Sequence, residues 1–278
     1  MAGTLRCGRF SLALDRPLVM GVLNVTPDSF SDGGRYLDRD AAIAHARRMV
    51  AEGADIVDIG GESTRPGARP VSEDEELERV LPVLEALREL PVPLSVDTRR
   101  PRVMREALAA GASMVNDIQA LEAPGALQAV AASGCGVCLM HKKGDPATMQ
   151  DNPVYADVVA EVKAYLAARI AAAEAAGIAR ERLVADPGFG FGKTAAHNLE
   201  LLRRLAELAE LGVPIAAGLS RKSTLGAITG RPAGERLAAS LAAALLAAQA
   251  GATILRVHDV RETRDVIAVW LAVREAGR

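Results

Sequence analysis

Side chains able to bind or activate a ligand recur at the ends of eight short apolar runs in this 278-residue sequence. They are Asn24, Glu62, Asp97, Asn116, Met140, Asp186, Lys222, Arg256 and His258. Carboxylates and amides accept hydrogen bonds from the N–H groups of a ligand, whereas Arg and Lys bind anions. If the apolar runs are parallel strands closed into a barrel, all of these groups meet at one mouth.

The last two runs carry cations. In ILRVHD, Arg256 and His258 share a face, because side chains two apart along a strand point the same way. A guanidinium matches phosphate oxygens, so the pair suits an anion; a salt bridge to a neighbouring carboxylate is the alternative. The preceding run ends in GLSRKS, which adds Arg221 and Lys222. Loops after strands seven and eight of a barrel frequently bind phosphate, which favours the anion site.

Three other runs end in acceptors, at Asp97, Asn116 and Asp186. A carboxylate can accept two hydrogen bonds from adjacent N–H donors, so a flat heterocycle would satisfy this set. Each residue taken alone is better explained as a helix cap. A metal cage is a third possibility, but no His or Cys pattern accompanies the acids.

The segment GFGFGKT resembles a phosphate-binding loop but lacks a required glycine. The nucleotide motif needs glycine where this chain has Pro187, and the three glycines from Gly188 to Gly192 have the wrong spacing for a dinucleotide fold. Glycines at a barrel rim instead let the backbone lie against a flat ring. The two phenylalanines between them pack in the core or touch that ring.

Two long loops complete the set of candidate residues. NVTPDSFSDGG offers Asn24 and Asp28, whose oxygens, with substrate phosphates, suit Mg²⁺. GGESTRPG offers Thr64 as a hydroxyl donor and Arg65 as a cation. Each loop alone could be turns and caps, but beside the cations they suggest flaps over a diphosphate.

The apolar runs alternate with Ala-, Leu- and Glu-rich segments of helical period, which predicts an α/β fold. The predicted strands are Leu18 to Asn24, Asp55 to Ile59, Val92 to Asp97, Ser113 to Asp117, Gly136 to Met140, Leu183 to Asp186, Val213 to Leu219 and Thr253 to His258. The predicted helices include 40–51, 73–90, 101–110, 154–176, 198–211 and 234–250. We therefore expect a single (β/α)8 TIM barrel over residues 1–278, with residues 1–16 as an N-terminal hairpin that closes the barrel bottom.

Composition excludes several classes of protein. A net charge of −2 leaves no basic field for nucleic acid. The first residues lack the apolar segment of a secretory signal, and the longest apolar stretch, 237–252, is too short to span a bilayer. We therefore expect a cytoplasmic protein. Cys135 and Cys138 spell C-x-x-C, yet they lie in an apolar strand and are interpreted as core residues.

Five segments, MGVLNVTPDSFSDGG, IGGESTRPGA, DPGFGFGKT, GLSRKS and LRVHDV, resemble in order the signature segments of bacterial dihydropteroate synthases. The resemblance covers nearly the whole chain. It implies condensation of 6-hydroxymethyl-7,8-dihydropterin diphosphate with 4-aminobenzoate, giving 7,8-dihydropteroate and diphosphate. It also implies Mg²⁺ as cofactor and a homodimer.

The resemblance also implies a role for each candidate residue. The pterin ring would be held by Asp97, Asn116, Asp186 and Lys222, with Met140 beneath it and Gly190 alongside. The diphosphate would be bound by Thr64, Arg256 and His258, and Mg²⁺ by Asn24. The 4-aminobenzoate pocket would be shaped by Phe30, Pro66 and Ser223. Catalysis would fall to Lys222, Arg65, Asp28, Arg256 and His258.

Similar enzymes are thought to release diphosphate first, leaving a pterin-methyl cation for the amine to attack. Acids around the ring would stabilise that cation, and cations at the rim would stabilise the diphosphate. The chain departs from the family pattern at Lys142 and Lys143, where Met and Gln are frequent, and at Thr224, where a bulkier apolar residue is common. Two alternatives remain open: a pterin-dependent methyltransferase domain and a non-catalytic pterin-binding paralogue.

Overall fold

The computed structural model describes residues 3–25, 35–62, 71–144, 149–150 and 152–276. Within them, eight parallel strands form one sheet in the order β8-β7-β6-β5-β4-β3-β10-β9. The strands are β3 (Leu18–Asn24), β4 (Ile56–Gly60), β5 (Leu94–Asp97), β6 (Met114–Asp117), β7 (Gly136–Met140), β8 (Leu183–Asp186), β9 (Ala216–Ala217) and β10 (Ile254–Val257). A parallel bridge between Ala185 and Ile215 joins the two edges, so the sheet closes into the predicted barrel.

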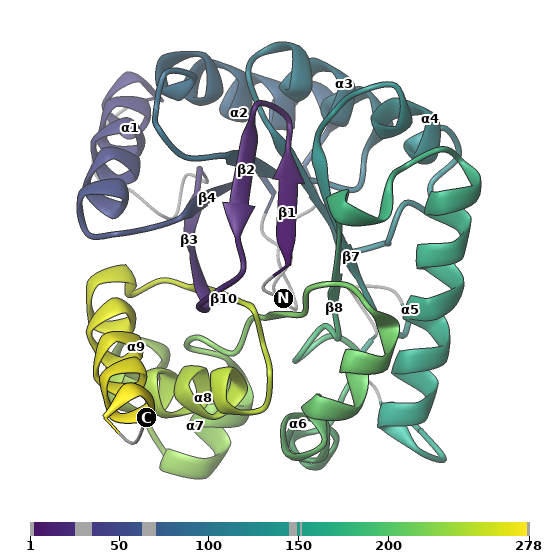
Figure 1. Cartoon of the computed structure of the whole chain (residues 1–278). Helices are drawn as coiled ribbons and strands as arrows, with labels where there is room; N and C mark the ends of the chain where they lie inside the picture. Colours follow the sequence, from purple (N-terminus) through teal and green to yellow (C-terminus); the bar gives the residue numbers. More distant parts are fainter. Residues whose placement is uncertain (1–2, 26–34, 63–70, 145–148, 151, 277–278) are drawn as a thin grey trace.

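Helices surround the barrel (Figure 1). They are α1 (Arg35–Ala51), α2 (Glu73–Leu87), α3 (Pro101–Ala109), α4 (Ala126–Ala131), α5 (Val158–Ala175), α6 (Ala195–Arg203), α7 (Ser223–Thr229), α8 (Leu237–Gln249) and α9 (Val260–Glu275). Short 3-10 helices add η2 (Arg180–Arg182), η3 (Leu205–Leu211) and η4 (Ala233–Glu235). None of the helices described is long and apolar enough to cross a membrane.

An N-terminal hairpin closes the lower end of the barrel, as predicted. Strands β1 (Thr4–Cys7) and β2 (Phe10–Ala13) pair antiparallel across the front of Figure 1. Leu5 and Cys7 of the hairpin are fully buried and pack on a small cluster inside the barrel that includes Met20, Ile56 and Met114. The much larger second cluster lies between the sheet and the helices. The barrel interior is therefore apolar only in its lower part.

Two elements differ from the sequence prediction. The predicted strand Val213–Leu219 is only two residues long, because Ala216 and Ala217 alone pair in register with β10. The predicted helix 198–211 ends at Arg203 and continues as the 3-10 helix η3. Leu205, Leu208 and Leu211 are buried at a spacing of three, which matches the three residues per turn of a 3-10 helix.

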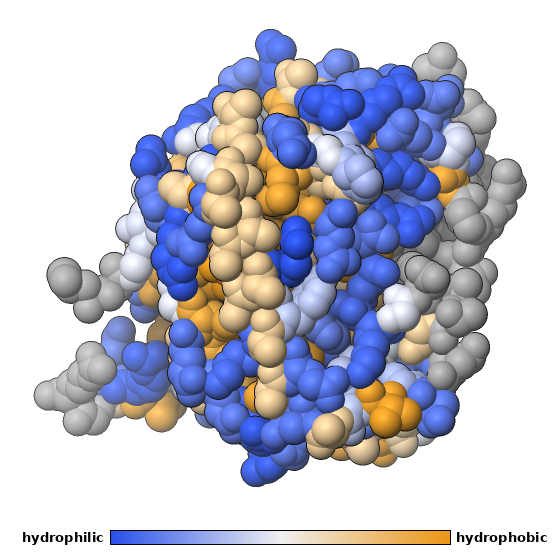
Figure 2. Space-filling view, turned by 90° about the vertical axis from the view of Figure 1, so that its right-hand side faces the viewer, coloured by the Kyte–Doolittle hydropathy of each residue, from blue (hydrophilic) through white to orange (hydrophobic). Residues whose placement is uncertain are grey.

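The outer face of α5 exposes a row of alanine side chains. Figure 2 shows a pale stripe running over α5 between hydrophilic side chains. Ala164, Ala167, Ala168 and Ala171 are exposed along this helix. Alanine is the strongest helix former, so the stripe is explained by helix propensity without a binding role.

Candidate active site

The strand ends bring most of the predicted residues to one end of the barrel. Parallel registers align Gly60 with Asp97, Asp97 with Asn116, and Met140 with Asp186. Gly60, Asp97 and Met140 end β4, β5 and β7, Asp186 ends β8, and Asn116 lies one residue before the end of β6. These five strands are neighbours in the sheet. The predicted common mouth therefore includes β4, β5, β6, β7 and β8, and the side chain of Arg256 reaches β4 and β5 from β10.

Arg256 occupies the centre of a buried polar cluster. Its Nε donates to Oδ2 of Asp58 at 2.7 Å, and its Nη2 donates to Oδ2 of Asp97 at 2.7 Å. Nδ2 of Asn116 donates to the same Asp58 oxygen at 3.0 Å. The salt bridge, which the sequence left as the alternative for Arg256, is thus present; a contact with diphosphate stays a prediction.

Asp58 is the one member of this cluster that was not anticipated. It is fully buried in β4, two residues before Gly60 and on the same face. The strand was recognised, but chemistry was assigned to Glu62 after it. The available signal was an aspartate in the middle of an apolar run, because a buried carboxylate needs a partner. Glu62 instead lies 3.4 Å from Nη2 of Arg100.

Three buried oxygens at this level have no hydrogen-bond partner among the described residues: Oδ1 of Asp58, Oγ of Ser95 and Oδ1 of Asn116. Buried polar atoms in folded proteins are nearly always paired, so these acceptors need a donor other than those that the described residues supply. A ligand with several N–H groups on one edge supplies such donors. This supports the predicted flat heterocycle.

The charges of Asp186 and Lys222 each affect the pKa of the other residue. Burial raises the pKa of Asp186, opposed by the charge of Lys222, and its Oδ1 accepts from the backbone N–H of Gly188 at 2.7 Å. Burial also lowers the pKa of Lys222 to about 8, opposed by Asp186. Nζ of Lys222 donates to the carbonyl of Phe189 and lies 4.8 Å from the centre of the Phe191 ring.

The pKa of the Asp97 carboxyl lies near neutral pH. Burial raises its pKa from 3.8 to about 7, against the lowering effect of Arg256. Such a group can change its protonation state near physiological pH, a property typical of functional sites.

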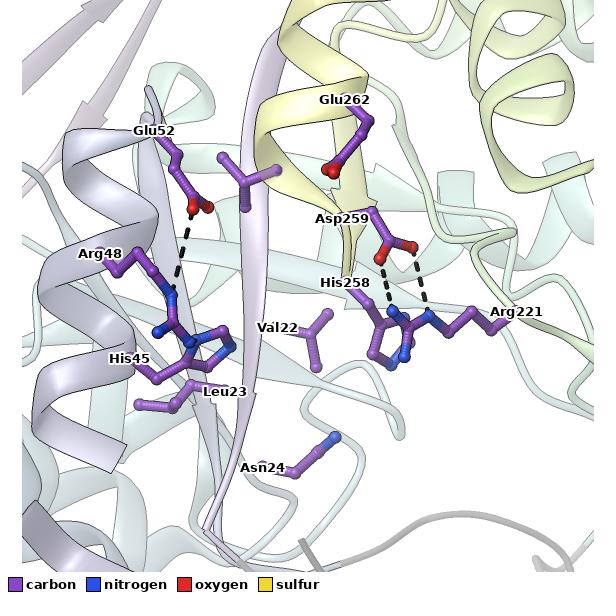
Figure 3. A pocket seen from close by; sticks show the side chains of 11 residues that line it. Val22, Leu23, Asn24, His45, Arg48, Glu52, Arg221, His258, Asp259 and Glu262 are labelled. Atoms are coloured by element: carbon purple, nitrogen blue, oxygen red, sulfur yellow. Dashed lines mark hydrogen bonds and ion pairs between the residues drawn. The ribbon is translucent and has the colours of Figure 1, made fainter. Parts of the chain in front are cut away.

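A cavity of about 380 Å³ opens between α1 and the start of α9 (Figure 3). Asn24 and His258 line it, and Nδ1 of His258 lies 3.0 Å from Oγ of Ser220. Arg221 enters the cavity from the loop before α7 but is paired with Asp259, its Nε lying 3.2 Å from Oδ2. Asn24 and His258 therefore line one cavity together with Arg221, while their predicted roles toward Mg²⁺ and diphosphate stay predictions.

The remaining predicted residues divide into two groups. Met140 is buried at the end of β7, Gly190 lies in the loop after β8, and Ser223 is exposed at the start of α7. The other group lies outside the described residues: Asp28, Phe30, Thr64, Arg65 and Pro66.

Among the described residues, no three His, Cys, Asp or Glu side chains are grouped to hold a metal. The three cysteines are buried and unpaired, as interpreted from the sequence. Burial raises the pKa of the Cys135 thiol, so it is not an activated nucleophile.

Known proteins resemble the chain over almost its full length. Residues 20–258 match the family model described as pterin binding enzyme. The dihydropteroate synthase of Escherichia coli K12 is 54% identical over 267 residues, covering 96% of this chain and 95% of that protein. That of Neisseria meningitidis serogroup B is 52% identical over 275 residues, covering 96% of both.

Two solved structures show the same architecture. Xanthomonas albilineans dihydropteroate synthase with 4-aminobenzoic acid has a TM-score of 0.93 and 56% identity, and 99% of each chain is covered. Burkholderia cenocepacia dihydropteroate synthase complexed with 7,8-dihydropteroate has a TM-score of 0.91 and 54% identity, covering 100% of this chain and 98% of that one. This chain belongs to the dihydropteroate synthases of the pterin-binding enzyme family.

Proposed function

We propose that this chain condenses 6-hydroxymethyl-7,8-dihydropterin diphosphate with 4-aminobenzoate to give 7,8-dihydropteroate and diphosphate. The observation that carries the proposal is the pair of buried, unpartnered acceptors on Asp58 and Asn116 beside Asp97 and Asp186. An aminopyrimidine edge offers the adjacent N–H donors that these oxygens lack. The relatives bound to 4-aminobenzoic acid and to 7,8-dihydropteroate support the identity of both ligands.

In this proposal the ring enters the mouth edge first. Asp186 and Asn116 accept from its N–H groups, Asp97 from the opposite side, and Lys222 donates to a ring acceptor. Met140 lies below the ring, and the backbone at Gly190 flanks it. These assignments make the mouth complementary to one flat, polar ring.

The reaction breaks the bond between the pterin methylene carbon and the bridging diphosphate oxygen. The electron pair leaves with diphosphate, and the arylamine nitrogen then bonds to the methylene carbon and loses a proton. Asp186, and Asp97 in its ionised form, stabilise the cation that forms on the pterin, because negative groups in a buried site act strongly on developing positive charge. Arg256 and His258, with Thr64 and Arg65, stabilise the leaving diphosphate.

Mg²⁺ is part of the proposal. Asn24, at the end of β3, and Asp28 would hold it together with diphosphate oxygens and water. One or two protein ligands are typical of Mg²⁺ sites that bind phosphorylated substrates, so this small donor set fits the ion. The ion would neutralise charge on the leaving group.

We also propose a cytoplasmic homodimer that binds these small molecules and no nucleic acid. Consecutive helices α7, α8 and α9 expose Ile228 (58%), Leu246 (53%), Val269 (66%) and Val273 (69%). Exposed apolar side chains gathered on neighbouring helices favour a subunit contact. Sedimentation should give the mass of two chains, and Leu246→Glu combined with Val269→Glu should give that of one; a monomeric unchanged protein would refute the dimer.

The central experiment mixes purified protein, Mg²⁺, the pterin diphosphate and 4-aminobenzoate, and measures diphosphate release. Release that depends on 4-aminobenzoate is expected. A non-catalytic paralogue would bind the pterin diphosphate without release, and a methyltransferase domain would not consume 4-aminobenzoate. Either outcome would overturn the synthase proposal.

A further inference from the structure

The lysine of the GFGFGKT segment is buried beneath its own loop. Lys193 is only 2% exposed. Its Nζ lies 2.9 Å from Nδ1 of His141, 2.9 Å from the carbonyl oxygen of Gly188 and 3.1 Å from that of Phe191. An ammonium group has three donors and no acceptor, so these three acceptors satisfy it completely.

The histidine partner is fixed in one form by this contact. His141 directly follows β7 and is 5% exposed. Burial, followed by the charge of Lys193, lowers the pKa of His141 to about 3, so its ring is neutral. Burial lowers the pKa of Lys193 to about 7; in its ammonium form the lysine donates to Nδ1, which places the ring proton on Nε2. Lys193 thus links the end of β7 to the loop that follows β8.

Every carbonyl of the loop 188–192 accepts from a side chain. Nζ of Lys193 donates to the carbonyls of Gly188 and Phe191, and Nζ of Lys222 to that of Phe189. The side-chain amide of Gln150 donates to the carbonyl of Gly190, and the hydroxyl of Tyr155 to that of Gly192 at 2.8 Å. This loop is held in place by side chains from several parts of the chain, and one of them is the site residue Lys222.

The glycines explain how the loop can lie so close to the segment after β7. Gly188 has φ +67°, and a Cβ there would be 1.9 Å from the carbonyl oxygen of His141. Gly192 has φ +63°, and a Cβ there would be 2.1 Å from the carbonyl oxygen of Lys143. Glycine is needed for both the backbone conformation and the close approach. The contact between the two segments is therefore direct backbone packing that Lys193 holds together.

A second brace reaches the loop from α6. Oδ1 of Asn198 accepts from the backbone N–H of Gly190 at 2.8 Å, and its Nδ2 donates to Oγ1 of Thr224 at 3.1 Å. Thr224 lies in α7, the helix whose N-cap is Lys222. The loop and Lys222 are thus connected on both sides, through Phe189 and through α7.

We propose that Lys193 is a positioning residue for the reaction: by tying the loop 188–192 to His141, it fixes Lys222 and the backbone at Gly190 against the substrate ring. The proposal rests on the proposed function for its ligand. It assigns the lysine of a motif that resembles a phosphate-binding loop to the support of the pterin site rather than to phosphate.

The test compares Lys193→Met with the matched control Lys163→Met, which removes a more exposed lysine whose Nζ lies 2.8 Å from Oε2 of Glu210. For Lys193→Met we expect the affinity for pterin diphosphate, measured by calorimetry, and kcat each to fall about tenfold or more, as when buried polar groups lose their donor. The KM for 4-aminobenzoate should change by less than about threefold. The control should match the unchanged protein in all three.

Hydrogen exchange of the peptide covering 188–192 supplies a readout independent of turnover. Faster exchange in Lys193→Met, and not in the control, supports the proposal. Unchanged exchange with unchanged pterin affinity overturns it, as does a lower melting temperature with unchanged kcat. If the methionine variant does not fold, Lys193→Gln, which keeps two donors, is measured in its place and should show the same changes in smaller degree. Failure of the unchanged protein to release diphosphate would refute the proposed function, while the exchange comparison still decides the role in the loop.

Discussion

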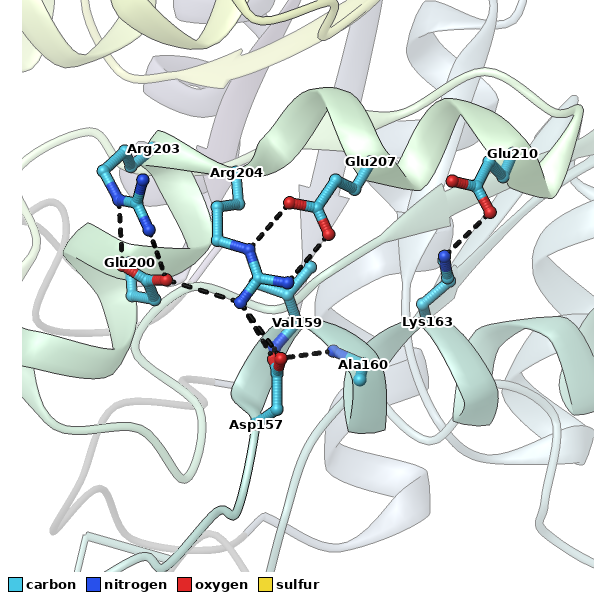
Figure 4. Close-up of polar contacts among 9 residues, drawn as sticks. All are labelled: Asp157, Val159, Ala160, Lys163, Glu200, Arg203, Arg204, Glu207 and Glu210. Carbon is cyan, nitrogen blue, oxygen red and sulfur yellow. Dashed lines mark hydrogen bonds and ion pairs between the residues drawn. The ribbon is translucent and has the colours of Figure 1, made fainter.

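Two clusters of arginine and carboxylate lie in opposite surroundings in this molecule. At the barrel mouth, Arg256 bonds the buried Asp58 and Asp97. On the outer surface, Arg204 bonds Asp157 at the start of α5 and Glu207 of η3 (Figure 4). The same chemical groups make both clusters, so the differences between them report on burial.

The pKa values show this difference. Burial raises the pKa of Asp97 despite its arginine, whereas hydrogen bonds from Ala160 and then Arg204 lower that of Asp157. Where water is excluded, the cost of desolvating a charge exceeds the attraction of one partner. At the surface the partner's effect dominates, but solvent and salt weaken it. A ligand that binds at the mouth can therefore change the charge state of Asp97, whereas Asp157 at the surface stays ionised at neutral pH.

The largest effect is expected from Arg256→Ala. It would leave two buried carboxylates without their counter-charge, which should lower the free energy of unfolding by about 3–5 kcal/mol and abolish diphosphate release. Urea unfolding followed by circular dichroism measures the first effect. A decrease in the free energy of unfolding below about 1 kcal/mol would mean that the ion pairs of Arg256 stabilise the fold no more than exposed ion pairs do.

Next in size is Asp186→Asn. This change replaces an acceptor with a donor that faces the N–H groups of the pterin ring, so binding should weaken by about 1.5–3 kcal/mol, or roughly ten- to a hundredfold. Calorimetry with the pterin diphosphate measures it, and Asp157→Asn on the surface is the matched control. Equal affinities for the two variants would remove Asp186 from the ring site.

The two clusters should also respond to pH with opposite signs. Between pH 3.8 and about 7, folded Asp97 keeps a proton that the unfolded chain has released, so stability should fall as the pH rises through this range. Asp157, with its lowered pKa, should instead lose its stabilising effect as the pH falls below about 4.

Free energies of unfolding measured from pH 3 to 8 separate these effects. Asp97→Asn should flatten the decline toward pH 7, and Asp157→Asn should flatten the decline at the acidic end. Curves for Asp97→Asn and the unchanged protein that run parallel between pH 4 and 7 would argue against a protonated Asp97.

The smallest effect is expected from Arg204→Ala. Its partners are solvated, so the urea midpoint should move little, and less still at high salt. Diphosphate release should equal that of the unchanged protein. A large shift in midpoint that persists in high salt would show that the surface cluster holds η3 on α5 more firmly than exposed ion pairs usually do.

Much of the fold and site could be predicted because strand periodicity decides which side chains point inward. Asp97, Asn116, Asp186 and Arg256 lie at the mouth for this reason. Asp58 was missed because its position in the middle of a strand marks it as buried without showing which cation it meets; that cation follows 198 residues later.

Contacts between distant segments account for the other differences. The 3-10 helix η3 begins just after Arg204, whose side chain bonds Asp157 at the start of α5. Similarly, Lys193 ends the segment GFGFGKT, to which the sequence assigned no partner for the lysine, and only the fold brings it to His141. Local pattern shows neither contact, because each joins residues about fifty positions apart in the chain.

The hairpin at the bottom of the barrel has a consequence for the order of events. With Leu5 and Cys7 filling the lower end, ligands reach the polar cluster from the upper rim. On the proposed function, we expect the ring, which would bind deepest, to arrive before the molecule that attacks it, and the joined product to leave before a new ring enters.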